Sequence, residues 1–137
     1  MITIISEEYP VQTGFFKRKL EPLARKIGVK GKITIKLGSG EESRSLNRKY
    51  RHEDHPTDVL TFPLRERTPD GLYAGDILIC YPVARKQARK NGQPLERELL
   101  MLMVHGLLHL KGYDHETDEG EMLRLQEEFM KHVVEEG

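Results

Sequence analysis

Leu99-Leu-Met-Leu-Met-Val-His105-Gly-Leu-Leu-His109-Leu110 is the longest apolar run of the chain, and two histidines interrupt it. Pro94 suits the first turn of a helix, where its missing N–H breaks no hydrogen bond, and Gly112 suits the residue that ends one. We therefore predict an apolar helix from Pro94 to Leu110 or Lys111. The run is shorter than the roughly 20 apolar residues that a transmembrane helix needs.

The segments around this helix alternate between strand and helix patterns. Strand patterns, rich in β-branched or alternating apolar residues, cover Ile2–Ser6, Lys32–Leu37, Asp58–Phe62 and Tyr73–Tyr81. Helical spacing predicts helices over Val11–Ile27, Glu41–Tyr50 and Pro82–Asn91, and a last helix opened by Thr117 or Asp118. Pro63 is expected to end its strand, and residues 65–71 to form a charged loop. The order predicts one α+β domain over residues 1–137, with a roughly four-stranded mixed sheet packed against about five helices.

The composition is that of an ordinary globular protein. The 137 residues include 22 Lys and Arg against 22 Asp and Glu, so the formal net charge is zero and no strongly basic domain is indicated. The single cysteine, Cys80, excludes an intramolecular disulfide framework and fits a reducing compartment. The N-terminus has no signal-peptide pattern. We expect a cytoplasmic protein without a membrane partner, with Cys80 buried in a strand.

The neutral total conceals a charge gradient along the chain. Residues 1–60 carry 12 Lys and Arg against 8 Asp and Glu, whereas residues 101–137 carry 3 against 9. Such asymmetry can mark an interaction surface, or folding can mix the segments and leave no patch. If the fold keeps the two signs on separate faces, the chain presents a basic approach to the histidine site described next.

Three histidines form the pattern with the clearest chemistry. His105 and His109 are four residues apart on the predicted helix, so their side chains project from one face and can reach one metal ion. Gly112 lets the chain turn back, and His115 follows closely enough to supply a third nitrogen. Three imidazoles and one open position are typical of catalytic zinc. We predict one Zn²⁺ ion, bound by His105, His109 and His115 at the end of the penultimate helix.

The histidine spacing, H-x-x-x-H-x-x-G-x-x-H, is that of the metzincin peptidases, with one departure. Those enzymes carry a glutamate after the first histidine as general base, whereas this chain has Gly106. A peptidase mechanism therefore loses its acid–base group, while the metal ligands are unaffected. Asp114 either orients a ligand histidine or stabilises the turn. The remaining histidines, His52, His55 and His132, are expected at the surface.

A second polar segment, residues 47–63, leads into a predicted strand, which is a common place for functional side chains. Arg51 is the main candidate, because a guanidinium can hold a phosphate with two hydrogen bonds and stabilise developing charge. The alternative for Arg51 is a surface salt bridge with Glu53 or Asp54. Three further polar residues are expected to brace loops and turns: Thr57, Asp58 and Asp76.

The motif from His105 to His115 resembles that of the YbeY family of metal-dependent bacterial endoribonucleases. Further motifs extend the resemblance over nearly the full chain: Asn47 with Tyr50-Arg51, Pro56-Thr-Asp-Val-Leu-Thr-Phe-Pro63, Gly75-Asp-Ile77 and Glu98. Family members commonly have serine at position 61, and Leu-Leu-Gly-Tyr where this chain has Leu110-Lys111-Gly112-Tyr113. Neither departure touches a predicted ligand.

The resemblance implies a zinc-dependent endoribonuclease, specific for single strands, in maturation of the 16S rRNA 3′ end and in ribosome quality control. Its partners would be ribosomal RNA and the small ribosomal subunit. In the family the three motif histidines bind the metal, and the arginine of the Tyr-Arg pair, Arg51 here, is functionally essential. Two alternatives stay open: a metallohydrolase of another substrate, such as a peptide or small molecule, and a non-catalytic, zinc-stabilised ribosome-assembly factor.

Overall fold

A computed structural model describes residues 1–113 and 120–135 of the chain. Its elements follow in the order β1 (Ile2–Ile5), α1 (Thr13–Ile27), β2 (Lys32–Gly38), α2 (Gly40–Arg51), β3 (Val59–Thr68), β4 (Gly71–Cys80), α3 (Tyr81–Lys90), α4 (Leu95–Lys111) and α5 (Glu121–Glu135). The α+β class is confirmed, since this part of the chain contains a four-stranded sheet and five helices. The residues predicted to open the last helix, Thr117 and Asp118, lie outside the described residues.

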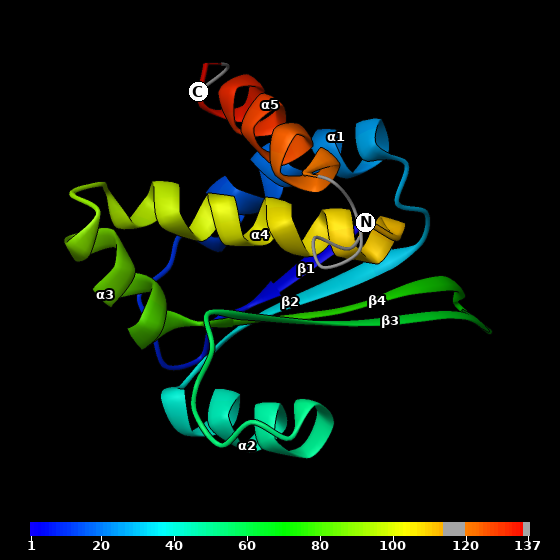
Figure 1. The fold of residues 1–137 in the computed structure, drawn as a ribbon. Coiled ribbons are helices and arrows are strands. Elements are labelled where there is room, and N and C mark those ends of the chain that lie inside the picture. The colour runs from blue at the N-terminus through cyan, green and yellow to red at the C-terminus, as the bar shows by residue number, and fades with distance from the viewer. Residues whose placement is uncertain (114–119, 136–137) are drawn as a thin grey trace.

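The sheet is mixed and has the strand order β1-β2-β4-β3. Strands β1, β2 and β4 run parallel to their neighbours, whereas β3 pairs antiparallel with β4 as a hairpin. Helices α1, α4 and α5 cover one face of the sheet, and α2 lies on the opposite face (Figure 1). Strand β3 comes last in the strand order and therefore forms one edge of the sheet. Helix α4 contacts it from one face and α2 from the other.

Helix α4 forms the centre of the core. It packs against α1, α3, α5, β3 and β4, so apolar side chains point from it in most directions, as expected for a helix covered on several sides. The side chains of Met103, Val104, Leu107 and Leu108 are fully buried. The alternating residues predicted for β2 belong to the same core, among them Ile33 and Ile35, which are likewise buried.

Strand β3 is longer than predicted, and the expectation that Pro63 ends it is wrong. The strand continues to Thr68 and returns through a two-residue turn into β4. Proline is tolerated because β3 is an edge strand, where a missing N–H breaks no ladder bond. The register shifts just after Pro63, and the resulting bulge leaves Arg65 with a φ of 48°. The predicted charged loop is thus mostly strand with a bulge.

Other local predictions are confirmed. The sequence offers Ser39 or Gly40 as the cap of the helix that follows, and Ser39 caps α2, where its Oγ accepts a hydrogen bond of 3.1 Å from the N–H of Glu42. Gly112 ends α4 with a φ of 122°, a conformation that favours glycine. Cys80 is buried, and burial raises the pKa of its thiol. None of the helices in the described residues combines the length and the hydropathy needed to cross a membrane.

Candidate functional site

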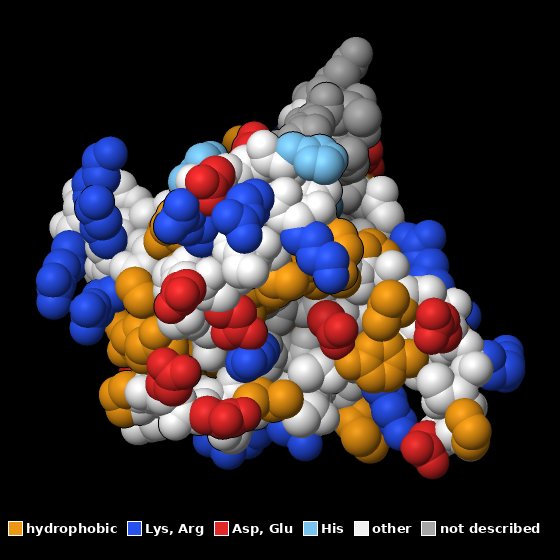
Figure 2. All heavy atoms as spheres, turned by 90° about the horizontal axis from the view of Figure 1, so that it is seen from below, with side chains coloured by type: hydrophobic (Ala, Val, Ile, Leu, Met, Phe, Trp, Pro, Cys, Tyr) orange, Lys and Arg blue, Asp and Glu red, His pale blue; other side chains and the backbone are white. Residues whose placement is uncertain are grey.

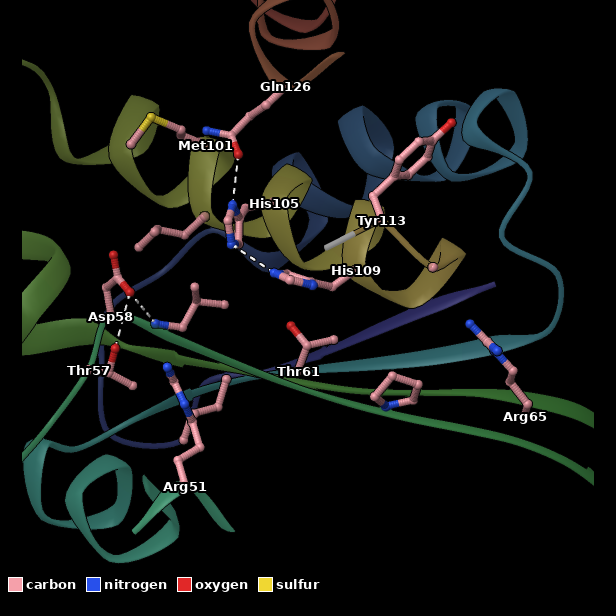
Figure 3. Close-up of a pocket in the computed structure, with 15 residues that line it drawn as sticks. Arg51, Thr57, Asp58, Thr61, Arg65, Met101, His105, His109, Tyr113 and Gln126 are labelled. Atoms are coloured by element: carbon pink, nitrogen blue, oxygen red, sulfur yellow. Dashed lines mark hydrogen bonds between the residues drawn. The ribbon is translucent and has the colours of Figure 1, made fainter. Parts of the chain in front are cut away.

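A pocket of about 720 Å³ lies between α4 and the edge strand β3 (Figure 3). Helix α4 contributes His105 and His109, α5 contributes Gln126, and the end of α2 contributes Arg51. The loop before β3 and the strand itself form the facing wall, which includes Asp58. The structure therefore brings together Arg51 and two of the three histidines that were predicted as metal ligands.

The two histidines present the same nitrogen atom to one point in the pocket. The Nε2 atoms of His105 and His109 are 3.2 Å apart, and their rings meet edge to face with centroids 4.7 Å apart. Both side chains are half-buried, which keeps their outer nitrogens accessible from the pocket. The spacing of four residues therefore places both rings on one face of α4, as predicted.

Gln126 of α5 fixes the orientation of the His105 ring. Its Oε1 atom lies 2.8 Å from Nδ1 of His105. An amide oxygen only accepts hydrogen bonds, so Nδ1 must carry the proton, and the neutral ring then has its lone pair on Nε2. A partner that selects the tautomer in this way is typical of histidines that bind metals. Gln126 was not predicted, because it lies 21 residues away in sequence on another helix.

The donor pair fits a zinc ion. Two nitrogens bound to one zinc at about 2.0–2.1 Å with near-tetrahedral angles lie about 3.3 Å apart. The observed Nε2–Nε2 distance of 3.2 Å agrees with this value. His115, the predicted third ligand, and Asp114 lie outside the described residues. Within residues 1–113 and 120–133, no third His, Cys, Asp or Glu joins the pair in an arrangement that holds a metal.

Gly106 lies between the two histidines in sequence but faces the sheet rather than the pocket. A Cβ atom placed on it would lie 2.7, 2.8 and 3.0 Å from Cδ1, Cγ2 and Cγ1 of Ile77 in β4. Real Cβ atoms do not approach other carbons so closely, so a side chain at position 106 requires α4 and β4 to separate. The glutamate that metzincin peptidases carry at this position therefore has no room here.

Arg51 is the last residue of α2 and reaches the pocket from the face of the sheet opposite to α4 (Figure 3). The salt bridges considered for it do not form. Asp54 instead accepts two hydrogen bonds from Arg44, of 2.8 and 3.1 Å, which lower the pKa of its carboxyl. Glu53 lies 3.6 Å from His55. Within the described residues Arg51 forms no ion pair, and its side chain is exposed.

Hydrogen bonds hold the loop that follows Arg51 against α2. The buried hydroxyl of Ser43 donates to the carbonyl of Thr57 at 2.8 Å and accepts from its N–H at 3.0 Å. The Nδ2 atom of the buried Asn47 donates to the carbonyl of His55 at 2.9 Å. Asp58 accepts a hydrogen bond of 2.8 Å from the N–H of Val59 at the start of β3. The bracing role predicted for Thr57 and Asp58 is confirmed.

The supporting role predicted for Asp76 is confirmed as well. Its Oδ1 atom accepts a hydrogen bond of 2.5 Å from the hydroxyl of Tyr73, which also contacts Thr34 at 2.7 Å. Of the remaining histidines, His52 and His55 are exposed as expected. His132 is half-buried and lines a surface hollow between α1 and α5, so it is less exposed than the other two.

Arg65 is a charged pocket residue that was not predicted. Its segment was expected to be a loop, whereas the bulge in β3 brings it to the end of the pocket beside Gly112. Its Nη2 atom lies 3.4 Å from the carbonyl oxygen of Leu110, near the C-terminus of α4. No local sequence signal marks this position, because a bulge and a positive φ depend on how β3 pairs with β4.

The charge gradient of the sequence does not become a continuous basic face on the side that carries α2. There, Lys and Arg side chains are interspersed with Asp and Glu (Figure 2). In the pocket, the described lining holds Arg51 and Arg65 against the single carboxylate of Asp58. These two arginines give the described part of the pocket an excess of positive charge.

One buried acid lies on the same helix as the two histidines. Glu98, on α4, is fully buried, and its Oε1 atom accepts a hydrogen bond of 3.0 Å from Gln93. Its Oε2 atom has no hydrogen-bond partner within the part of the chain that the structure describes. Burial therefore raises the pKa of Glu98, with a smaller contribution from the negative charge of Asp58.

Comparison with known proteins places this arrangement in a family. Residues 8–134 match the model of the family described as endoribonuclease YbeY. The chain is 42% identical over 112 residues to the endoribonuclease YbeY of Burkholderia lata, covering 80% of this chain and 64% of that protein. It is 38% identical over 125 residues to that of Persephonella marina, covering 87% and 82%.

A solved structure is similar over nearly the whole chain. The solution structure of TM1509 from Thermotoga maritima aligns with a TM-score of 0.69 and 35% identity, covering 99% of this chain and 91% of that one. The chain spans less than two thirds of the Burkholderia relatives it matches, 64% and 63% in two of them. With the family model matched from residue 8 to residue 134, the chain belongs to the YbeY family.

Proposed function

We propose that the chain is a zinc-dependent endoribonuclease that cleaves single-stranded RNA. The observation that carries the proposal is the pair of imidazole Nε2 atoms, 3.2 Å apart, in a pocket that also contains Arg51. Relatives that share most of this chain are named endoribonucleases. The finer assignment, to 16S rRNA 3′-end maturation and ribosome quality control in the cytoplasm, rests on the resemblance of the motifs to this family. Its partners would be ribosomal RNA and the small ribosomal subunit.

His105 and His109 would hold the zinc ion, with His115 as the expected third ligand. When bound, zinc supplies a Lewis acid for a phosphoryl oxygen and lowers the pKa of a water molecule to about 7. Gln126 holds the His105 ring in the tautomer that a ligand needs, because its Oε1 atom takes up the Nδ1 proton. The protein thereby avoids reorienting this ring when the metal enters.

Arg51 would bind the phosphate that is cleaved. Its guanidinium lines the same pocket as the two histidines and forms no ion pair within the described residues, so its N–H groups can serve a substrate. A planar group with five donors matches the oxygens of a phosphate and stabilises the charge that grows on them in the transition state. The hydrogen bonds between α2 and residues 55–57 hold the backbone that follows it.

The two alternatives are less well supported. A peptidase would need a general base after the first histidine, and a side chain at Gly106 would clash with Ile77 of the sheet rather than enter the pocket. A non-catalytic assembly factor would have no need for Arg51 beside the metal ligands, whereas Arg51 lines their pocket.

The test compares zinc content and RNA cleavage in four proteins: the wild type, His109→Ala, Arg51→Ala and Arg48→Ala. Arg48 is a matched control, because it is an exposed arginine one turn earlier on α2 and does not line the pocket. We expect His109→Ala to lose zinc and cleavage of a 16S rRNA precursor, Arg51→Ala to keep zinc and lose cleavage, and Arg48→Ala to keep both. Full cleavage by zinc-free His109→Ala protein would refute the proposal. Casein hydrolysis that depends on His105 would favour a peptidase.

A further inference from the structure

Arg65 is a non-glycine residue in a left-handed conformation at the rim of the pocket. Its φ of 48° occurs within the bulge of β3, where two residues of β3 face one residue of β4. L-residues rarely adopt this conformation, and glycine, asparagine or aspartate usually occupy it. Bulges of this kind commonly redirect a side chain near a functional site. The strained residue here is itself an arginine, and its side chain lines the pocket.

The position of Arg65 complements that of Arg51. The two arginines lie at opposite sides of the pocket, with His105, His109 and Thr61 between them (Figure 3). They come from different elements, α2 and β3, and no ion pair engages Arg65 within the described residues. The pocket therefore offers one cationic group on each side of the histidine pair.

The guanidinium of Arg65 retains most of its hydrogen-bonding capacity. Among the described residues, one hydrogen bond engages this guanidinium, from Nη2 to the carbonyl oxygen of Leu110, and it is long at 3.4 Å. A guanidinium carries five N–H donors, so the others remain available to oxygens of a ligand. A carbonyl at the C-terminal end of a helix also attracts a cation, which helps to hold the arginine near the mouth of the pocket.

We propose that Arg65 binds a second backbone phosphate of the RNA, on the other side of the cleavage position from the phosphate held by Arg51. The inference rests on the proposed function, because it takes the histidine pair as the centre of cleavage. A polynucleotide has a phosphate at every nucleotide, so a chain that crosses the pocket presents charge to both arginines.

The test measures binding as a function of salt. The probe is a fluorescein-labelled single-stranded 2′-O-methyl RNA of about 12 nucleotides, which keeps its phosphates and resists cleavage. Each phosphate contact to a single strand contributes about 0.7 to the slope of log K against log salt concentration. Arg65→Gln removes the charge but keeps a polar side chain with N–H donors. Arg65→Lys keeps the charge. Arg67→Gln is the matched control, because Arg67 is exposed on the same strand and does not line the pocket.

We expect Arg65→Gln to reduce the slope by about 0.7 and to weaken binding about two- to fivefold at moderate salt. Arg65→Lys and Arg67→Gln should keep the wild-type slope, and zinc content should be unchanged in all three variants. An unchanged slope in Arg65→Gln, or an equal reduction in Arg67→Gln, would overturn the inference.

The same proteins separate this inference from the proposed function. If the wild type cleaves RNA in a His109-dependent manner and Arg65→Gln keeps its slope, only the inference on Arg65 fails. If Arg65→Gln reduces the slope while cleavage does not depend on His109, the nuclease proposal fails and the phosphate contact stands.

Discussion

The contact between Gly106 and Ile77 allows a quantitative prediction for Gly106→Ala. The new methyl group would lie 2.7–3.0 Å from three carbons of Ile77, a β-branched side chain that is 1% exposed and cannot turn away. Inserting a methyl group into a packed core costs about 1–3 kcal/mol. Alanine recovers up to about 1 kcal/mol through its higher helix propensity. We expect a net destabilisation of about 1 kcal/mol.

Gly14→Ala provides the matched control. Gly14 lies in the first turn of α1, is exposed, and a Cβ placed there would meet only the end of the flexible Arg18 side chain, at 3.4 Å. That substitution should be neutral or slightly stabilising, so the two variants should differ by about 1–3 kcal/mol. The assay is urea unfolding followed by far-UV circular dichroism, because the chain has no tryptophan.

A double mutant identifies the contact responsible. Ile77→Ala alone should cost about 2–5 kcal/mol, but in that background Gly106→Ala should cost nothing and can stabilise by up to about 1 kcal/mol, because the three crowding carbons are gone and only the helix propensity of alanine remains. The reasoning would be refuted if Gly106→Ala were as stable as Gly14→Ala, or if it destabilised the protein equally with and without the Ile77 side chain.

Three further predictions follow from hydrogen bonds and burial. Gln126→Leu leaves the Nδ1 atom of His105 without its partner and should weaken zinc binding about 10–100-fold in a chelator competition, with little change in unfolding midpoint; unchanged affinity would contradict the orienting role. The raised pKa of Glu98 means that the folded state holds its proton more tightly than the unfolded state, so stability falls as pH rises above the usual value near 4.5. Glu98→Gln should remove that decline in urea unfolding measured between about pH 4 and pH 8, and an identical pH profile would exclude Glu98 as its source. Ser43→Ala loses both hydrogen bonds to Thr57 and should cost about 1–3 kcal/mol by the same assay, whereas a loss below about 0.3 kcal/mol would show that these bonds do not hold α2 in place.

Much of the fold could be predicted from residue patterns, because the relevant signals are local. The alternation of apolar and polar residues predicted β2. The helical spacing of apolar residues, with Gly112 at its end, predicted α4. The spacing of His105 and His109 placed both rings on one helix face, which determines most of the candidate site. These signals work because side-chain direction along a helix or strand follows directly from its period.

The errors and omissions share a different cause, which is dependence on the pairing of distant segments. A proline would end a central strand but is tolerated at an edge, as Pro63 is here, and the edge position of β3 follows only from the sheet order. Arg65 enters the pocket through a bulge in the same strand, and Gln126 through the packing of α5 on α4. The sequence alone shows that Gly106 replaces the general base of the peptidases. The close approach of Gly106 to Ile77 can be seen only in the structure.

The polar attachment of α2 has a consequence for the dynamics of the pocket. The buried residues of α2 are Ser43 and Asn47, so hydrogen bonds rather than apolar area hold it to the sheet, whereas α4 is anchored by a continuous apolar core. Segments with little buried apolar surface open more readily than the core, by local rather than global unfolding. Backbone amides of α2 should therefore exchange with deuterium well before those of α4. The histidines then belong to the last part of the protein to unfold and Arg51 to one of the first, so a phosphate held by Arg51 would slow exchange in α2 without affecting α4.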